Sequence, residues 1–274
     1  MSHHQIRGRT LTAGAGVLAI ALLVPVFAVN SADAAAAPVA APALSPSIAP
    51  GGNFDLSRWE LQLPTGSAGS PTTISPAKLE GSSGFQDSYF YTNTSDGSME
   101  FWDPENGVTT PNSSYSRSEL REMNTDGSAA AWSIPGTHTL SATVKATQVP
   151  NHVCVGQIHL GDNSGSTKPL LELFYYSNGD IKMAIEQTPA GGNEIQYTVG
   201  NVPLGTPWSY VIGLSGSNTI SLTLNGTKHT WALPSAFNGY TMYFKAGDYD
   251  QSTGSSSTVG ARVQFYALSI HHSS

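Results

Sequence analysis

Short stretches of alternating apolar and polar residues recur along most of the chain. In "RWELQLP" (58–64), Trp59, Leu61 and Leu63 alternate with charged or amide side chains. The same period of two, bounded by Gly, Asn, Ser and Pro, continues in segments 87–93, 98–103, 116–123, 137–147, 153–160, 170–176, 180–187, 209–215, 219–225, 240–247 and 261–272. This period predicts β-strands that bury one face. Helix is scarce, and "SPAKLE" with Ser75 as N-cap is the one plausible short helix.

About a dozen short strands in one domain predict an all-β fold, a jelly-roll β-sandwich of two antiparallel sheets with a concave substrate cleft. Asn-Gly pairs at 106–107, 178–179 and 225–226 are typical of hairpin turns. The composition agrees, since the chain is rich in Gly and only 11% of its residues are charged. Without an internal repeat or a second change of composition, residues 51–274 are predicted to form a single domain.

The first fifty residues have a different character. Arg7 and Arg9 precede an apolar run over 11–29, and Ala32-Asp33-Ala34 resembles a signal-peptidase site. We therefore expect a signal peptide over 1–34, followed by an Ala/Pro-rich linker over 35–50. A membrane anchor is the weaker alternative, and we expect a secreted, extracellular protein.

Charge and cysteine content narrow the possible partners. The formal net charge of −7 makes the chain a poor general binder of nucleic acid or anionic membranes. An acidic substrate would require the few basic residues to gather at the site. The single cysteine, Cys154, excludes an internal disulfide and is interpreted as a buried core residue. A monomer is expected.

Three strand segments carry functional groups on one face, because side chains alternate across a strand. The rows are Arg117, Glu119 and Arg121 in the first segment, Gln157 and His159 in the second, and Lys245, Tyr249 and Gln251 in the third. Each row alone could be an ordinary solvated face. Together, Arg, Gln, His and Tyr in a chain with few charges favour a binding or catalytic site.

"RSELRE" (117–122), "QIH" (157–159) and "YFKAGDYDQ" (243–251) resemble, in this order, the signature segments of polysaccharide lyase family 7, the alginate lyases. "FDLSRWELQLP" (54–64) is also similar to the opening strand of that family, so the resemblance covers nearly the whole predicted domain. One departure is Asp250, where the family usually has Asn. Together with Asp248, it would place two carboxylates near a polyanion site, and the sequence leaves open whether they alter substrate affinity and pH behaviour.

The resemblance implies β-elimination in alginate, which leaves 4,5-unsaturated uronate oligosaccharides. Arg117 and Gln157 would neutralise the uronate carboxylate, His159 would remove the C5 proton, and Tyr249 would protonate the leaving O4. The family favours Arg117 over Arg121 as the neutraliser, although the sequence alone does not separate them. Such a reaction needs no metal and no cofactor.

The other residues of the rows are expected to bind substrate or support the site. Glu119 is expected to pair with both arginines, and Lys245 to lower the cost of the Tyr249 phenolate. Arg121 and Gln251 are further substrate-binding candidates. A His and Tyr flanking the sugar, and Ile in the second signature, imply a preference for guluronate-containing blocks. Endolytic cleavage is expected, although the choice between endo and exo cutting depends on loops whose geometry the sequence does not show.

Two other kinds of carbohydrate protein fit the same fold. A jelly-roll glycoside hydrolase needs two carboxyl groups flanking the bond, and no such pair on one face is apparent. A non-catalytic carbohydrate-binding module would not need His and Tyr beside Arg and Gln. The remaining features are interpreted as structural: Asn112–Ser114 as a simple loop, His271 and His272 as a solvated tail, and His138 as a surface residue.

Overall fold

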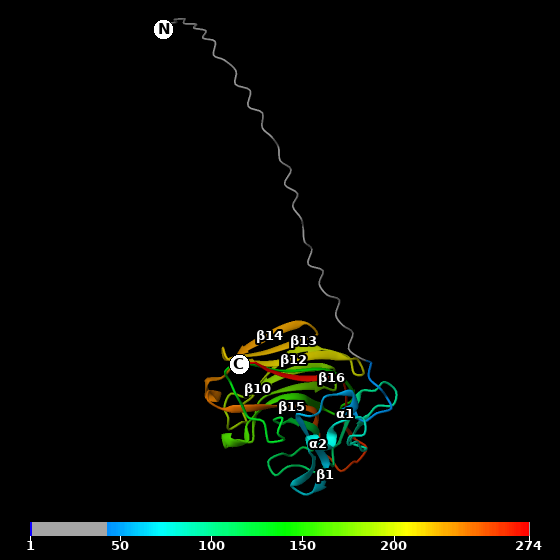
Figure 1. Ribbon diagram of the computed structural model, residues 1–274. Coiled ribbons are helices and arrows are strands. Elements are labelled where there is room, and N and C mark those ends of the chain that lie inside the picture. Colours follow the sequence, from blue (N-terminus) through cyan, green and yellow to red (C-terminus); the bar gives the residue numbers. More distant parts are fainter. Residues whose placement is uncertain (2–42, 274) are drawn as a thin grey trace, which may run out of the picture. The chain divides into compact units, whose positions relative to one another are not determined.

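The computed structural model describes Met1 and residues 43–273, and residues 43–273 form two stacked antiparallel sheets (Figure 1). The first sheet has the order β11 (Ile195–Asn201), β10 (Asp180–Ile185), β9 (Pro169–Tyr176), β8 (His152–Leu160), β15 (Thr241–Asp250), β5 (Ser118–Glu122), β1 (Trp59–Ser67) and β2 (Ser70–Ile74), with β6 (Trp132–Ser133) pairing with β15. The second has the order β14 (Thr227–Ala232), β13 (Thr219–Leu224), β12 (Trp208–Ser215), β7 (Thr137–Gln148), β16 (Gly260–Ser273), β4 (Met99–Pro104) and β3 (Phe90–Thr92). The predicted β-sandwich is confirmed.

The helices are short. α1 (Pro50–Asn53) and α2 (Pro76–Leu79) each begin with proline, and Ser75 occupies the N-cap position of α2, as predicted. Single 3-10 turns follow at Asp162–Ser164 and Ser235–Phe237. Among the described residues, none of the helices is long and apolar enough to cross a membrane.

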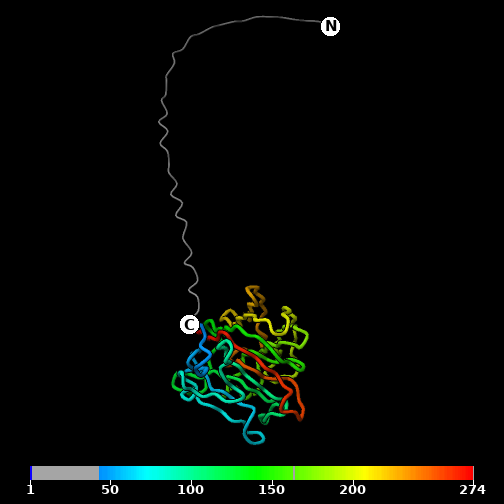
Figure 2. Tube along the Cα trace, turned by 90° about the vertical axis from the view of Figure 1, so that its right-hand side faces the viewer, coloured from blue at the N-terminus to red at the C-terminus, as the bar shows by residue number. Residues whose placement is uncertain are grey.

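The two sheets bury their inner faces against each other. On β1, Trp59, Leu61 and Leu63 are buried, as the alternation predicted, while Glu60 and Gln62 point to the outer side. In both views the β13–β14 hairpin and the β1–β2 hairpin lie at opposite ends of the domain (Figures 1 and 2). Cys154 is buried, and its thiol donates to the carbonyl of Gly156.

The compact unit begins earlier than residue 51. Residues 2–34 of the predicted signal peptide and residues 35–42 of the predicted linker lie outside the described residues. Residues 43–50, also assigned to the linker, pack on the domain instead. Leu44 contacts the core, and Ala49 is 2% exposed with its backbone N–H donating to the carbonyl of Ser82.

The positions of His272 and His138 differ from two predictions. His272 is part of β16, and its Nε2 donates to Glu122 on the other sheet at 2.7 Å. His138 is 5% exposed, stacks on Trp132 with ring centroids 4.2 Å apart, and hydrogen-bonds His272 at 2.8 Å. His272 is therefore a link between the sheets, and His138 is not a surface residue.

Candidate active site

The three signature segments are neighbours on the first sheet. β15 lies between β8 and β5, so Lys245 is opposite Gln157 on one side and Arg121 on the other. Tyr243 is opposite His159, and Gly247 is opposite Glu119. The rows that alternation assigned to one face therefore meet on one surface, which is the outer face of this sheet.

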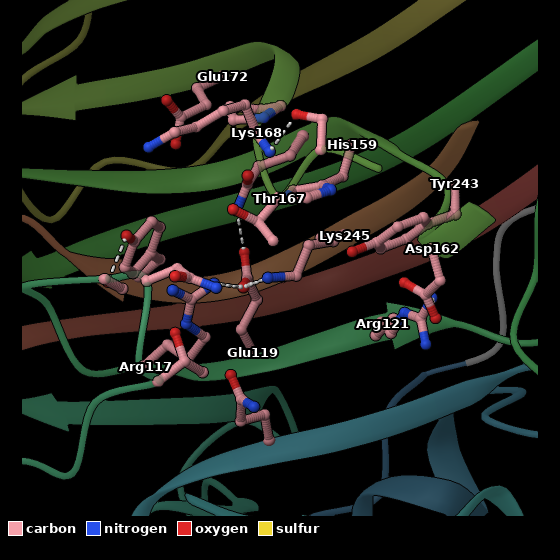
Figure 3. Close-up of a pocket in the computed structure, with 18 of the residues that line it drawn as sticks. Arg117, Glu119, Arg121, His159, Asp162, Thr167, Lys168, Glu172, Tyr243 and Lys245 are labelled. Atoms are coloured by element: carbon pink, nitrogen blue, oxygen red, sulfur yellow. Dashed lines mark hydrogen bonds and ion pairs between the residues drawn. The ribbon is translucent and has the colours of Figure 1, made fainter. Parts of the chain in front are cut away.

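That surface is hollowed into a cleft of about 670 Å³. Its lining contains every site residue predicted from the sequence: Arg117, Glu119, Arg121, Gln157, His159, Lys245, Tyr249 and Gln251. Figure 3 shows five of these side chains around the cleft: Arg117, Glu119, Arg121, His159 and Lys245. The loops around Asn112 and Thr167 border the same space, so the Asn112–Ser114 loop is part of the cleft.

Gly247 permits the close packing of β15 against β5. Gly247 has φ 150°, and a Cβ there would lie 2.8 Å from the backbone of both Ser118 and Glu119. The register of β15 against β8 also shifts between Ala246 and Tyr249. A bulge of this kind re-aims the next side chain, and here Tyr249 enters the cleft.

Glu119 lies at the centre of the site and is 0% exposed. It forms an ion pair with the Lys245 ammonium, accepts from Gln157 Nε2 at 2.5 Å, and is 3.4 Å from the Arg117 guanidinium. Burial raises the pKa of Glu119, but Lys245 and Arg117 outweigh it, and the net pKa is lowered. Glu119 is thus an anion that orients three donors.

Arg121 does not pair with Glu119, although this pairing was predicted. Arg121 pairs with Asp162 at 2.9 Å and lies over the ring of Tyr243, with its guanidinium carbon 4.3 Å from the centroid. Glu119 therefore holds Arg117 and Lys245 rather than both arginines. With two cations around one anion, this cluster has a net charge of +1, which suits one carboxylate of a ligand.

Tyr249 is bordered by Arg117. The Arg117 guanidinium carbon is 3.9 Å from the ring centroid, and the phenol hydroxyl is 2.9 Å from Ser113 Oγ. Burial raises the pKa of Tyr249, although Arg117 and the Ser113 hydrogen bond act in the opposite direction. The phenol is therefore protonated at neutral pH, as a proton donor must be.

His159 has a defined tautomer. Its Nδ1 is 3.0 Å from the carbonyl of Leu160, which can only accept, so Nδ1 carries the proton and Nε2 is free to accept one. Burial, with Lys245 nearby, lowers the pKa of His159 to about 4. The imidazole is neutral at neutral pH, as a base requires. A bound polyanion would raise this pKa by favouring the charged form.

The two aspartates of the third segment do not face the cleft. Asp248 and Asp250 are both 0% exposed and point beneath it, where Asp103 accepts from the backbone N–H of Asp250 at 3.1 Å. Burial raises the pKa of Asp250 to about 6. Burial, with Asp103 contributing, also raises the pKa of Asp248 well above its ordinary value. Neither carboxylate therefore lies on the surface that would contact substrate, and both belong to the buried part of the fold.

Replacing Asp250 by Asn is expected to stabilise the fold at pH 7 by about 1–3 kcal/mol and to have little effect at about pH 4. Because the folded-state pKa of Asp250 is raised to about 6, the contribution of its protonated carboxyl group to wild-type stability is lost as pH rises from about 4 to about 6. Thermal unfolding at both pH values measures this. Asp126→Asn, on an exposed loop, should give no gain, and an equal gain for Asp250→Asn at both pH values would contradict the explanation.

Sequence reasoning missed several residues of the lining. Glu172 and Glu186 lie on the β9–β10 side, Lys168 precedes β9, and Asp162 holds Arg121. Glu172 could have been suspected, because it is an acid within the apolar segment 170–176. Its place in the cleft, however, depends on the register of β9 against β8.

Comparison with known proteins gives a consistent picture. The family model described as alginate lyase matches residues 54–272. The family 7 alginate lyase A1-II′ is 36% identical, with a TM-score of 0.74 covering 82% of this chain and 100% of that chain, in a Tyr-to-Phe variant with product (GGG). A His-to-Asn, Tyr-to-Phe variant of the same enzyme, in complex with substrate (GGMG), has the same identity and TM-score.

Two further relatives come from named bacteria. The alginate lyase from Pseudomonas aeruginosa is 34% identical, with a TM-score of 0.73 covering 80% of this chain and 100% of that one. The alginate lyase from Klebsiella pneumoniae is 26% identical over 282 residues, covering 82% of this chain and 91% of its own. Since the family model spans most of the chain and the folds agree, this chain belongs to the alginate lyases of polysaccharide lyase family 7.

Proposed function

We propose that this alginate lyase cleaves guluronate-containing blocks endolytically by β-elimination at the cleft of the first sheet. The convergence of Arg117, Gln157, His159 and Tyr249 on one cleft carries the proposal. Membership of the alginate lyase family favours a lyase over the two alternatives, a glycoside hydrolase and a non-catalytic carbohydrate-binding module.

The reaction begins with the substrate carboxylate. Its negative charge opposes removal of the neighbouring C5 proton, because the electron pair would add a second charge. Arg117 retains N–H donors beyond the one directed at Glu119, and the Gln157 amide has a second N–H. These donors, in a cluster of net charge +1, would stabilise the enolate-like state.

Proton transfer would then involve two residues. His159 Nε2 takes the C5 proton, the C4–C5 double bond forms as the C4–O4 bond breaks, and the Tyr249 hydroxyl protonates O4. The two groups come from different strands, β8 and β15, which suits a sugar held between them. In guluronate the C5 hydrogen and O4 lie on opposite sides of the ring, and two separate groups fit that geometry.

One observation supports the guluronate preference, and another supports the endolytic mode. The complexes of A1-II′ contain product (GGG) and substrate (GGMG), in which G conventionally denotes guluronate and M mannuronate. The cleft also extends across several strands, from Glu60 on β1 to Glu172 on β9, so it is wider than one sugar ring. A long cleft favours binding within a polymer.

The test is product analysis on separate polyguluronate and polymannuronate. We expect ultraviolet-absorbing unsaturated oligosaccharides to form faster from polyguluronate, with a mixture of sizes and a rapid loss of viscosity at the start. New reducing ends without ultraviolet absorbance would indicate hydrolysis instead. Depolymerisation of polymannuronate alone would exclude the guluronate preference, and early release of a single small product would exclude endolytic cleavage.

A further inference from the structure

Glu172 is an acidic side chain in a cleft built for a polyanion. It lies on β9 directly opposite Gln157, which in turn is opposite Lys245, so the three occupy consecutive positions across the sheet. Residues opposite each other on adjacent strands have Cβ atoms about 4.5–5.5 Å apart. Figure 3 shows Glu172 on the wall of the pocket across from Glu119. A ligand held by Gln157 therefore comes within reach of Glu172.

The carboxyl group of Glu172 has no hydrogen-bond or ion-pair partner in the described part of the chain. No hydrogen bond and no ion pair to another described residue involves it, unlike Glu119 and Glu186, which both accept hydrogen bonds. The charged groups around it are Glu194, Glu186, Lys168, Glu119, Arg117 and Lys245. Its unpaired position in this cleft leaves its hydrogen-bonding capacity available to a ligand.

We propose that Glu172 is a substrate-binding residue that acts as a neutral carboxylic acid, donating a hydrogen bond to the uronate next to the one that Gln157 contacts. An ionised Glu172 would repel that uronate, whereas the acid form can bind it. The proposal rests on the proposed function, since it takes a polyuronate as the ligand.

The protonation state supports this role. Burial, followed by Glu194 and Glu119, raises the pKa of Glu172 to about 8, while Arg117 and Lys245 act in the opposite direction. Glu172 therefore carries its proton at neutral pH and loses it in mildly alkaline solution. Lys245, whose pKa is lowered to about 8 by burial and Arg117, loses its charge over the same range. A wild-type pH profile alone would not separate the two.

The experiment compares substrate affinities within one background. In His159→Asn protein, which should consume the ligand about 10²- to 10⁴-fold more slowly, calorimetry gives the Kd of guluronate oligosaccharides at about pH 6 and about pH 9.5. The Kd of the parent divided by that of Glu172→Gln should be near one at the lower pH and should rise to about five- to tenfold at the higher pH. With its pKa at about 8, Lys245 is charged in both proteins at about pH 6 and largely neutral in both at about pH 9.5, so its own charge does not produce the change in the ratio between these two pH values.

Two other variants complete the test. Glu172→Ala loses the hydrogen bond and should bind about three- to tenfold more weakly at about pH 6. Glu60→Gln removes an equal charge elsewhere in the lining and should give a ratio that does not change with pH. A pH-independent ratio for Glu172→Gln, an unchanged Kd for Glu172→Ala, or no binding by the parent would each overturn the proposal. The product analysis of wild type decides separately whether the proposed function fails.

Discussion

Exchange of His159 for Asn is expected to lower kcat on alginate by about 10²- to 10⁴-fold, the usual contribution of a general base. Asn fits the space and keeps a polar side chain, but it has no nitrogen lone pair that can take the C5 proton. KM should change much less, because Arg117 and Gln157 remain to bind the carboxylate. Initial rates of unsaturated product formation over a range of alginate concentrations measure both constants.

Tyr249→Phe should cause a loss of similar size, because the leaving O4 would then receive no proton from the enzyme. The double variant should be little worse than the poorer single variant, since the two groups act in one step.

The control for His159→Asn is His152→Asn, which makes the same His-to-Asn exchange on the same strand, where His152 stacks on Tyr176 outside the cleft lining. It should retain near wild-type activity, and a His159→Asn enzyme within threefold of wild type would exclude His159 as the base.

The strand alternation was sufficient to predict which face each site residue occupies. Alternation depends only on local strand geometry. The signature residues lie on strands that are paired in regular register around Gln157 and Lys245, so the alternation holds there. Edge strands were less predictable. β11 and β14 were missed because most of their side chains are exposed, so neither shows the apolar period of a half-buried strand.

Pairings between distant segments could not be predicted from the pattern. The sequence places Glu119 between two arginines, yet the cation that pairs with it alongside Arg117 is Lys245, which the strand order brings next to it. Arg121 instead meets Asp162, which belongs to the 3-10 turn after β8. The inward direction of Asp248 follows from alternation alone, whereas its burial against Asp103 depends on the second sheet.

Glu119→Gln is expected to destabilise the fold by about 3–5 kcal/mol, because removal of one partner leaves buried charge uncompensated. Lys245 is 6% exposed and Arg117 is 9% exposed, so neither cation can turn fully to water. Since the pKa of Glu119 is lowered in the folded state, its contribution is present above the unfolded-state pKa and is lost as pH falls through the folded-state value. The difference in unfolding free energy between wild type and variant should therefore shrink in acid.

Chemical denaturation at about pH 7 and at several pH values below about 4 measures this difference. The activity of the folded variant reports on the orientation of Arg117 and Gln157. Glu119→Gln combined with Lys245→Met removes one cation together with the anion and should recover part of the lost stability. It should not recover activity, because the net charge returns to +1 but the anion that orients Arg117 and Gln157 is absent. If Glu119→Gln were as stable as wild type, Glu119 would not be the anion that holds the two cations in place.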